Sequence, residues 1–249
     1  MINLGILGQQ IVTVAASPRN MGITTGSPSS LLTNLIAYWK LDETSGTRND
    51  SVGANHLADN NTVTSTTGKI GTAGQFTSAN NEYLSIADNA DVSTGDIDYS
   101  VAAWVMLDST GTSRNIIGKG NPSSGGGCEF CLRYTGGANV FIFTAGKSGG
   151  ESQAQHTLTV STGVWYFVVG WYNSVSNLAN IRVNDGTTVS VSHTSGWDTA
   201  LSLFIGVDTV ATGRYWNGRI DEVGFWKRVL TAEEITTLYN NGNGITYPF

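Results

Sequence analysis

The stretch from Trp216 to Gly242 constrains the fold of this chain more than any other. Residues 220–226 alternate between two sets, which is the two-residue period of a β-strand. The sets are Ile220, Glu222, Gly224 and Trp226 on one face and Asp221, Val223 and Phe225 on the other. A strand is therefore expected here, with Asp221 and Glu222 on opposite faces of its sheet.

A short helix is predicted directly after this strand. Thr231 and Glu234 have the spacing of a capping box, in which side chain and backbone satisfy each other at the first turn. The apolar residues that follow fall on one helical face, and a glycine is placed to stop the last turn. These residues are Ile235, Leu238, Tyr239 and Gly242.

A second block lies near the other end of the chain. It reads Tyr38-Trp39-Lys40-Leu41-Asp42-Glu43-Thr44-Ser45-Gly46, followed by Asp50-Ser51-Val52-Gly53. Together the two blocks resemble the opening and the closing of concanavalin A-like, laminin G-like jelly-roll domains, over about residues 33 to 245. The resemblance implies an all-β fold, a jelly-roll sandwich of two antiparallel sheets with one short C-terminal helix. It assigns no function, because lectins, glycosidases, adhesion modules and virion proteins share this fold.

The residues between the two blocks predict a succession of strands separated by turns. Val101–Leu107 and Trp165–Tyr172 are apolar on both faces, which is typical of central strands. Asn184-Asp185-Gly186 between two alternating segments predicts a hairpin turn. The expected strands are Leu35–Leu41, Gly74–Thr77, Tyr83–Ile86, Tyr99–Leu107, Asn115–Lys119, Glu129–Tyr134, Val140–Ala145, His156–Val160, Trp165–Tyr172, Ala179–Val183, Thr188–His193, Leu203–Val207 and Tyr215–Trp226.

Residues 1–32 read as an extended docking arm and linker that precede a jelly-roll domain of residues 33–249. Pro18 and Pro28 frame a segment rich in Gly, Ser and Thr. A secretory signal is the alternative, but no Lys or Arg precedes the apolar part and two glutamines interrupt it. The apolar arm residues expected to dock on a neighbouring protein are Ile2, Leu4, Ile6, Leu7, Ile11, Val12 and Val14.

Composition excludes two classes of partner. The formal charge is −6, whereas a surface that binds nucleic acid needs a basic stripe. No apolar run has the length of a membrane-spanning helix. Charged residues make up only 13% of the chain, about half the usual share. This fits either a neutral β surface or one partly covered by other subunits, and we expect a homo-oligomer or a larger assembly.

No residue pattern predicts catalysis. Retaining glycoside hydrolysis needs two carboxylates on one face, and the one alternating acidic pair is Asp96 and Asp98, which fits a solvated loop better. The histidines lie in unrelated segments. Cys128 and Cys131 lack a second pair for zinc and are expected to be free thiols, since residues three apart on a strand point to opposite faces.

Two kinds of binding site remain open. The resemblance to laminin G-like domains implies a structural Ca²⁺, with Asp50 and Asp221 as the ligand positions; the alternative is that both carboxylates accept backbone hydrogen bonds. A glycan could pack on exposed aromatic rings, and the loop positions of Trp197, Tyr215 and Trp216 make them the candidates.

Three functions follow from these features. The first is a non-enzymatic structural or decoration protein of a phage virion, assembled in the host cytoplasm and anchored to capsid or tail proteins by its arm. Residues Leu31 to Glu43 look like sequences common in phage-borne laminin G-like domains, and such a protein could also adhere to host glycans. The second is a secreted bacterial carbohydrate-binding or adhesion module, which would be extracellular. The third, a glycoside hydrolase, is disfavoured by the missing carboxylate pair.

Overall fold

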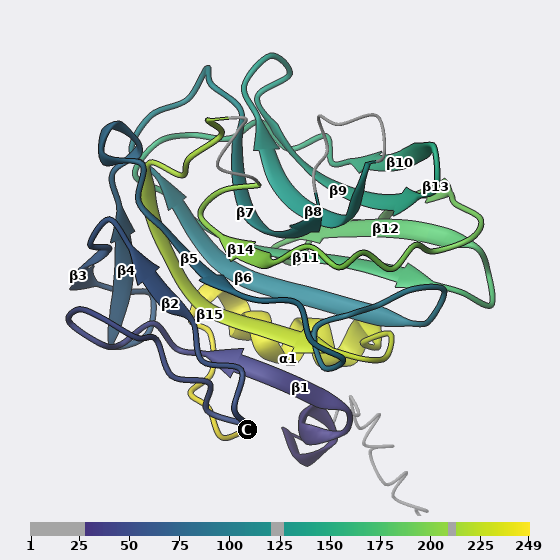
Figure 1. The fold of residues 1–249 in the computed structure, drawn as a ribbon, viewed down its shortest axis with the longest axis horizontal. Coiled ribbons are helices and arrows are strands. Elements are labelled where there is room, and N and C mark those ends of the chain that lie inside the picture. The colour runs from purple at the N-terminus through teal and green to yellow at the C-terminus, as the bar shows by residue number, and fades with distance from the viewer. Residues whose placement is uncertain (1–27, 121–126, 209–212) are drawn as a thin grey trace, which may run out of the picture.

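The computed structural model of the protein describes residues 28–120, 127–208 and 213–249. Two antiparallel sheets face each other, and one short helix lies outside one of them (Figure 1). This confirms the predicted all-β jelly-roll sandwich with a C-terminal helix. The arm residues named above, Ile2 to Val14, lie outside the described ranges. Within those ranges, no helix is long and apolar enough to cross a membrane.

The first sheet has eight strands. Its order is β13-β12-β11-β6-β15-β4-β3, and β1 pairs with β15 beyond this path. The long strands β6 and β11 lie at its centre and are buried along nearly their whole length, as their apolar sequences predict. The strands are β1 (Leu35–Trp39), β3 (Thr64–Thr67), β4 (Thr72–Phe76), β6 (Tyr99–Leu107), β11 (Trp165–Asn173), β12 (Leu178–Val183), β13 (Val189–Ser192) and β15 (Gly218–Trp226).

The second sheet has seven strands in the order β10-β9-β8-β7-β14-β5-β2. All of its pairings are antiparallel. The strands are β2 (Ala58–Asn60), β5 (Tyr83–Ile86), β7 (Arg114–Gly120), β8 (Cys128–Thr135), β9 (Val140–Lys147), β10 (Gly150–Gln155) and β14 (Leu203–Ile205).

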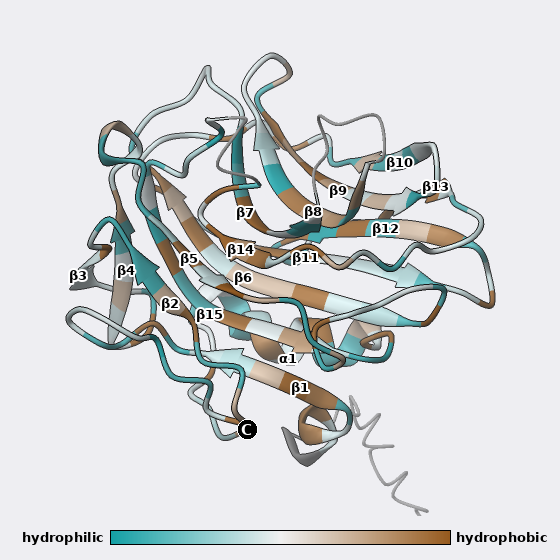
Figure 2. Ribbon diagram, viewed as in Figure 1, coloured by the Kyte–Doolittle hydropathy of each residue, from teal (hydrophilic) through white to brown (hydrophobic). Residues whose placement is uncertain are grey.

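Two hydrophobic layers hold the molecule together. The larger lies between the sheets and includes Trp39, Phe130 and Phe225. The smaller lies between the outer face of the eight-stranded sheet and the C-terminal helix, and includes Trp104 and Trp226. Figure 2 shows hydrophobic residues along β1, β6 and β15, which contribute to both layers, as β11 does. Both faces of this sheet are thus covered, which is why its central strands lack a polar face.

The C-terminal helix α1 (Ala232–Tyr239) begins as predicted. The Thr231 side chain accepts from the Glu234 amide, and the Glu234 side chain accepts from the Thr231 amide. The helix ends at Asn240, which adopts the left-handed conformation, two residues before the expected stop at Gly242. Asparagine tolerates this conformation and can replace glycine as a helix terminator.

The boundary between arm and domain must move toward the N-terminus. Residues Pro28–Leu32 form a 3₁₀ helix, and Leu31 is fully buried against α1. Trp226 Nε1 donates to the Leu31 carbonyl at 2.8 Å, and Glu234 accepts from Ser30 Oγ at 2.7 Å. Ser30 and Leu31, which the sequence assigned to the linker, therefore contact the jelly roll.

The closing strand β15 departs from simple alternation. Its register against β6 shifts between Asp221 and Gly224, and Glu222 has a φ of 49°. Glu222 is thus the extra residue of a β-bulge, which re-aims the side chains around it. The prediction that Asp221 and Glu222 point to opposite faces is wrong. Glu222 accepts from the Tyr38 hydroxyl and Asp221 pairs with Trp104, and both Tyr38 and Trp104 belong to the outer hydrophobic layer.

Most other predicted strands are observed, with ends shifted by a few residues. The segment His156–Val160 is an exception, because it forms a loop after β10. Its apolar residue Val160 packs into the core, so a buried loop imitated the alternation of a strand. The sequence did not predict β2, β3 and β10, because these strands are polar and lack an alternation of apolar and polar residues. The hairpin turn at Asn184-Asp185-Gly186 is confirmed between β12 and β13.

Candidate functional site

Trp197 is a partly exposed tryptophan in the loop between β13 and β14. Its backbone is fixed on both sides. Trp197 forms an isolated β-bridge with Gly95, and the Gly196 amide donates to Asp96 Oδ1 at 3.0 Å. On the other side, the Thr199 amide donates to Glu129 Oε2 at 3.0 Å. The indole therefore stands on a backbone that is held in place before any ligand binds.

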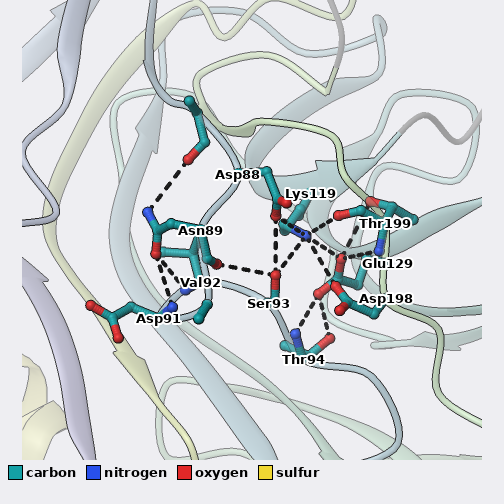
Figure 3. Close-up of polar contacts among 12 residues, drawn as sticks. Asp88, Asn89, Asp91, Val92, Ser93, Thr94, Lys119, Glu129, Asp198 and Thr199 are labelled. Atoms are coloured by element: carbon teal, nitrogen blue, oxygen red, sulfur yellow. Dashed lines mark hydrogen bonds and ion pairs between the residues drawn. The ribbon is translucent and has the colours of Figure 1, made fainter.

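A buried ion pair lies beneath this loop (Figure 3). Lys119 on β7 and Glu129 on β8 have fully buried side chains, and Lys119 Nζ lies 2.6 Å from Glu129 Oε2. Lys119 Nζ also lies 2.9 Å from Asp88 Oδ1 and 3.5 Å from Asp198 Oδ1. Burial acts to lower the pKa of Lys119, but its contacts with Glu129 and Asp88 outweigh burial and raise it. The lysine stays protonated and joins three carboxylates.

Glu129 ties two loops to the sheet. Its Oε1 accepts from the Thr94 amide at 2.5 Å and from Thr94 Oγ1 at 2.8 Å. Its Oε2 accepts from the Thr199 amide and hydroxyl as well as from Lys119. Figure 3 shows Thr94 and Thr199 converging on this carboxylate from separate loops. A buried charge that is paired and fully hydrogen-bonded in this way holds its surroundings in one arrangement.

Glu129 reaches this position because of a β-bulge. Between β7 and β8 the register shifts so that Lys119 faces Phe130 and Gly120 faces Cys128, which leaves Glu129 unpaired. The same irregularity brings the thiol of Cys131 into hydrogen-bond contact with that of Cys128. The expectation that these thiols point to opposite faces is therefore wrong. Both are free and buried, and burial raises the pKa of Cys131.

The acidic pair Asp96 and Asp98 holds loops as well. Asp96 Oδ1 accepts from the Tyr172 hydroxyl at 2.8 Å in addition to the Gly196 amide. The Gly196 bond, followed by the Tyr172 bond, lowers the pKa of Asp96. Asp98 Oδ1 accepts from the amide and the hydroxyl of Ser174, each at 2.8 Å. Both carboxylates are thus engaged as loop anchors.

The exposed part of this region combines an aromatic ring with carboxylates. The Asp198 side chain is 61% exposed and that of Asp88 is 32% exposed, so both keep oxygens available to solvent. We call Trp197, Asp88 and Asp198 the Trp197 surface. An aromatic face packs on the CH groups of a sugar ring, and carboxylates accept hydrogen bonds from its hydroxyls. The sequence identified Trp197 but missed Lys119 and Glu129, although Glu129 interrupts an apolar run, which is the signal of a buried charge.

The other two aromatic candidates do not join this surface. Trp216 is fully buried in the core between the sheets, and its Nε1 donates to the Arg219 carbonyl at 3.2 Å. It cannot present a ring to a ligand, so its selection as an exposed residue is wrong. The reason is that β15 begins only at Gly218, and the preceding residues turn inward to close the core. Tyr215 is 8% exposed and packs near Tyr83, with ring centroids 6.3 Å apart.

Asp50 holds a loop with every acceptor position of its carboxylate. Oδ1 accepts from the amides of Tyr38 at 3.0 Å and Val52 at 2.9 Å. Oδ2 accepts from the amides of Gly53 at 3.0 Å and Asn55 at 3.1 Å. A carboxylate offers about four lone-pair sites, so no site is left for a calcium ion. Asp50 fits the alternative role of a backbone acceptor.

The two oxygens of the Asp221 carboxylate differ in their hydrogen bonds. Oδ2 accepts from the amides of Lys69 at 2.7 Å and Ile70 at 3.0 Å, whereas Oδ1 is buried and has no hydrogen-bond partner in the part of the chain that the structure describes. Burial raises the pKa of Asp221 to about 8 against the opposing effect of these amides. Across the described ranges, no three or more His, Cys, Asp or Glu side chains are grouped to hold a metal. Asp50 and Asp221 are therefore not part of such a group, and calcium binding at these positions stays a prediction.

Comparison with known proteins agrees with the fold. The sequence model of the concanavalin A-like lectin/glucanases superfamily, laminin G type, matches residues 78–236, which is more than half of the chain. The chain belongs to this superfamily. No curated protein sequence gives a significant match.

Three solved structures have a similar fold. The binding domain of a paraclostridial mosquitocidal protein has a TM-score of 0.69 at 14% identity, over 85% of this chain and 53% of that one. Domain 4 of an extracellular arabinanase from Geobacillus stearothermophilus, in complex with arabinotriose, has 0.62 at 18%, over 82% and 97%. A Trypanosoma rangeli sialidase has 0.62 at 13%, over 86% and 34%. The chain therefore spans about half of the mosquitocidal binding domain and nearly all of the arabinanase domain.

Proposed function

We propose that this chain is a non-enzymatic glycan-binding domain that uses the Trp197 surface. The observation that carries the proposal is a partly exposed tryptophan on a backbone fixed by Asp96 and Glu129. The next residue in the same loop, Asp198, has an accessible carboxylate, as has Asp88, and both contact Lys119. A preorganised surface loses less conformational entropy on binding than a flexible loop does. The arabinanase domain that was solved with arabinotriose supports a sugar ligand, since it matches over nearly its full length.

The anchoring roles of the acidic residues support binding without catalysis. A general acid or base must be free to exchange a proton with the substrate. Asp96, Asp98 and Glu129 instead accept two or more hydrogen bonds each from loops of the protein. Asp221 and Glu222 are buried beneath Tyr38, away from the Trp197 surface.

For the biological setting we propose a phage virion, in which residues 1–27 dock on capsid or tail proteins and the jelly roll is displayed outward. The resemblance of residues 31–43 to phage-borne laminin G-like domains supports this setting, and host-surface glycans would be the ligand. A secreted bacterial adhesion module is the alternative. Deleting residues 2–14 discriminates between them: a virion protein loses association with particles while its jelly roll stays folded, whereas a secreted module loses no such partner.

Replacing Trp197 tests glycan binding directly. We expect W197A to lose the signal on a glycan array, with affinity for the best glycan at least about tenfold weaker, because a stacked aromatic supplies a large part of such binding energy. The thermal midpoint should stay close to that of the wild type, since the ring is partly exposed. The matched control is W171A, which removes a tryptophan from the opposite, helix-covered layer. Unchanged array binding by W197A, or no glycan bound by the wild type, would refute the proposal.

A further inference from the structure

One edge of the sandwich is closed by two short strands, β10 and β13, that belong to different sheets. β10 is the edge strand of the seven-stranded sheet and β13 that of the eight-stranded sheet, and the two contact each other (Figure 1). Among the described residues, β10 pairs only with β9 and β13 only with β12. An edge held by so few contacts opens at a lower cost in free energy than the centre of a sheet does.

A buried histidine follows each of these edge strands. His156 comes directly after β10, and its Nδ1 accepts from the Leu158 amide at 3.0 Å. Its Nε2 lies against the turn between β12 and β13 of the other sheet, since a Cβ on Gly186 would lie 3.4 Å from it. A ring nitrogen that accepts a hydrogen bond carries no proton, so protonation of Nδ1 would place two donors face to face.

His193 repeats this arrangement at the other end of the edge. It comes directly after β13, and its ring packs edge-on against that of Tyr172, with centroids 5.1 Å apart. Gly146 and Lys147, at the end of β9 in the opposite sheet, lie close enough to affect its pKa. Each histidine therefore bridges the two sheets, from the edge strand of one to a hairpin of the other.

The surroundings of His193 oppose a positive charge. Burial, followed by the charge of Lys147, lowers its pKa against the opposing effects of the Gly146 backbone and Asp96. Asp96 is already engaged, because its carboxylate accepts from the Tyr172 hydroxyl at 2.8 Å. A proton on His193 would thus lie in the interior beside a lysine.

The surroundings of His156 also favour the neutral ring. Burial lowers its pKa, against an opposing contact with the backbone of the β12–β13 turn. The acids on the neighbouring elements are directed elsewhere. Asp185 in that turn pairs with Arg182. Glu151 on β10 faces the outside of its sheet, because Ala154, three residues along the strand, faces the core.

We propose that the β10–β13 edge is an acid-sensitive clasp, closed while His156 and His193 are neutral and opened when both rings take up a proton. The open edge binds protons that the closed edge excludes, so acidification drives the opening. The stability of the closed clasp is fully present above about pH 6.5, the ordinary pKa of histidine, and is lost as pH falls below that value. Asp96 also accepts from the Gly196 amide, so opening at His193 extends to the loop that carries Trp197.

Hydrogen exchange read by mass spectrometry, corrected for the intrinsic pH dependence of exchange, measures this local opening. We expect the protection of residues 150–156 and 187–197 to fall about tenfold between pH 7.5 and pH 5, while residues 99–107 of the central strand β6 stay protected. A local measurement is needed because Asp221 contributes to the stability of the whole protein with the opposite sign: its folded-state pKa is raised to about 8.

The double variant H156N/H193F should abolish the acid response. Asparagine keeps an acceptor for the Leu158 amide, phenylalanine keeps the edge-on contact with Tyr172, and neither side chain titrates. The matched control is H56N, because His56 is exposed although its Nδ1 also accepts from a backbone amide, at 3.0 Å. The edge of H56N should open at pH 5 as that of the wild type does.

NMR titration of the wild-type imidazoles tests the protonation step without any substitution, so it decides the proposal even if the double variant is already open at pH 7.5. His156 and His193 should each titrate below about pH 6.5, together with the fall in protection. Titration of either ring at or above that value would refute the clasp, as would equal protection of the edge at pH 7.5 and pH 5. An acid response that persists in H156N/H193F, or is absent from H56N, also overturns it.

Discussion

Two β-bulges in this molecule each place a glutamate in the interior, and they treat its charge differently. In β8, the bulge residue Glu129 meets Lys119 at 2.6 Å and accepts from two loops. In β15, the bulge residue Glu222 accepts from the Tyr38 hydroxyl and lies near Asp221, another buried carboxylate. The first region holds a compensated charge, and the second holds two acids without a buried cation beside them among the described residues.

The difference shows how burial and pairing decide protonation. Burial raises the pKa of Glu222 to about 7, against the opposing hydrogen bond from Tyr38, and raises that of Asp221 to about 8. Near neutral pH the second region therefore holds protons, whereas Lys119 in the first region remains charged. We infer that the Asp221 region makes stability depend on pH.

The largest effect should come from breaking the compensated pair. K119M leaves the Glu129 carboxylate buried without its cation, and removing one partner of a buried pair costs about 3–5 kcal/mol. Equilibrium urea denaturation measures this loss. The exposure of Trp197 to a fluorescence quencher should rise as well, since Glu129 and Lys119 hold the loop beneath it.

The double variant K119M/E129Q is the control for this prediction. Glutamine carries no charge and keeps one oxygen, which can accept from the Thr94 amide or from the Thr199 amide but not from both. Because no unpaired charge stays buried, the double variant should still be more stable than K119M. A double variant as unstable as K119M would show that packing around the lysine stem, and not charge, holds this region together.

A smaller and pH-dependent effect is expected from D221N. The folded pKa of Asp221 is about 8, against about 3.9 in an unfolded chain, so between these values the native state binds more protons than the unfolded state. Stability from this group is fully present below pH 4 and is lost as pH rises toward 8. Asparagine removes the titration and still offers an oxygen to the Lys69 and Ile70 amides. We expect a gain of about 1 kcal/mol or more at pH 8 and little change at pH 4.

Chemical denaturation of D221N and wild type at pH 4, 6 and 8 measures this difference. Equal shifts at all three pH values would contradict the assigned protonation. A marked loss of stability at pH 8 would instead indicate that Asp221 binds a cation there, which is the remaining form of the calcium prediction. Added chelator would then destabilise the wild type and leave D221N unchanged.

The sequence predicted features that depend on neighbouring residues and missed those that depend on strand pairing. The capping box of Thr231 and Glu234 needs only local spacing, and it is observed. A two-residue period cannot indicate a β-bulge, so the directions of the Glu129 and Glu222 side chains could not be predicted from the sequence. Trp216 was misjudged for a similar reason: the alternation in the sequence extends to residues before Gly218, where β15 begins.

The candidate site was predictable only in part, for a related reason. Trp197 could be selected because Gly196 and Asp198 mark a loop. The residues that hold it, Lys119 and Glu129, lie about 70 to 80 positions away along the chain. Only the register of β7 and β8 brings them together.

The smallest effect is expected from a site where charge plays no part. T231A removes the hydroxyl that accepts from the Glu234 amide at 3.2 Å, and loss of a helix N-cap costs about 1 kcal/mol. Because Thr231 does not titrate, this loss of stability should be the same at pH 6 and pH 8. T231A is therefore the reference with which the pH-dependent change in stability of D221N is compared. Denaturation at both values checks it, with T237A on the exposed side of the same helix as the control. If the loss of stability in T231A increased with pH, the stability of α1 would depend on the same titration as the Asp221 region. The contrast between the two bulges would then not be enough to explain how the stability of the protein changes with pH.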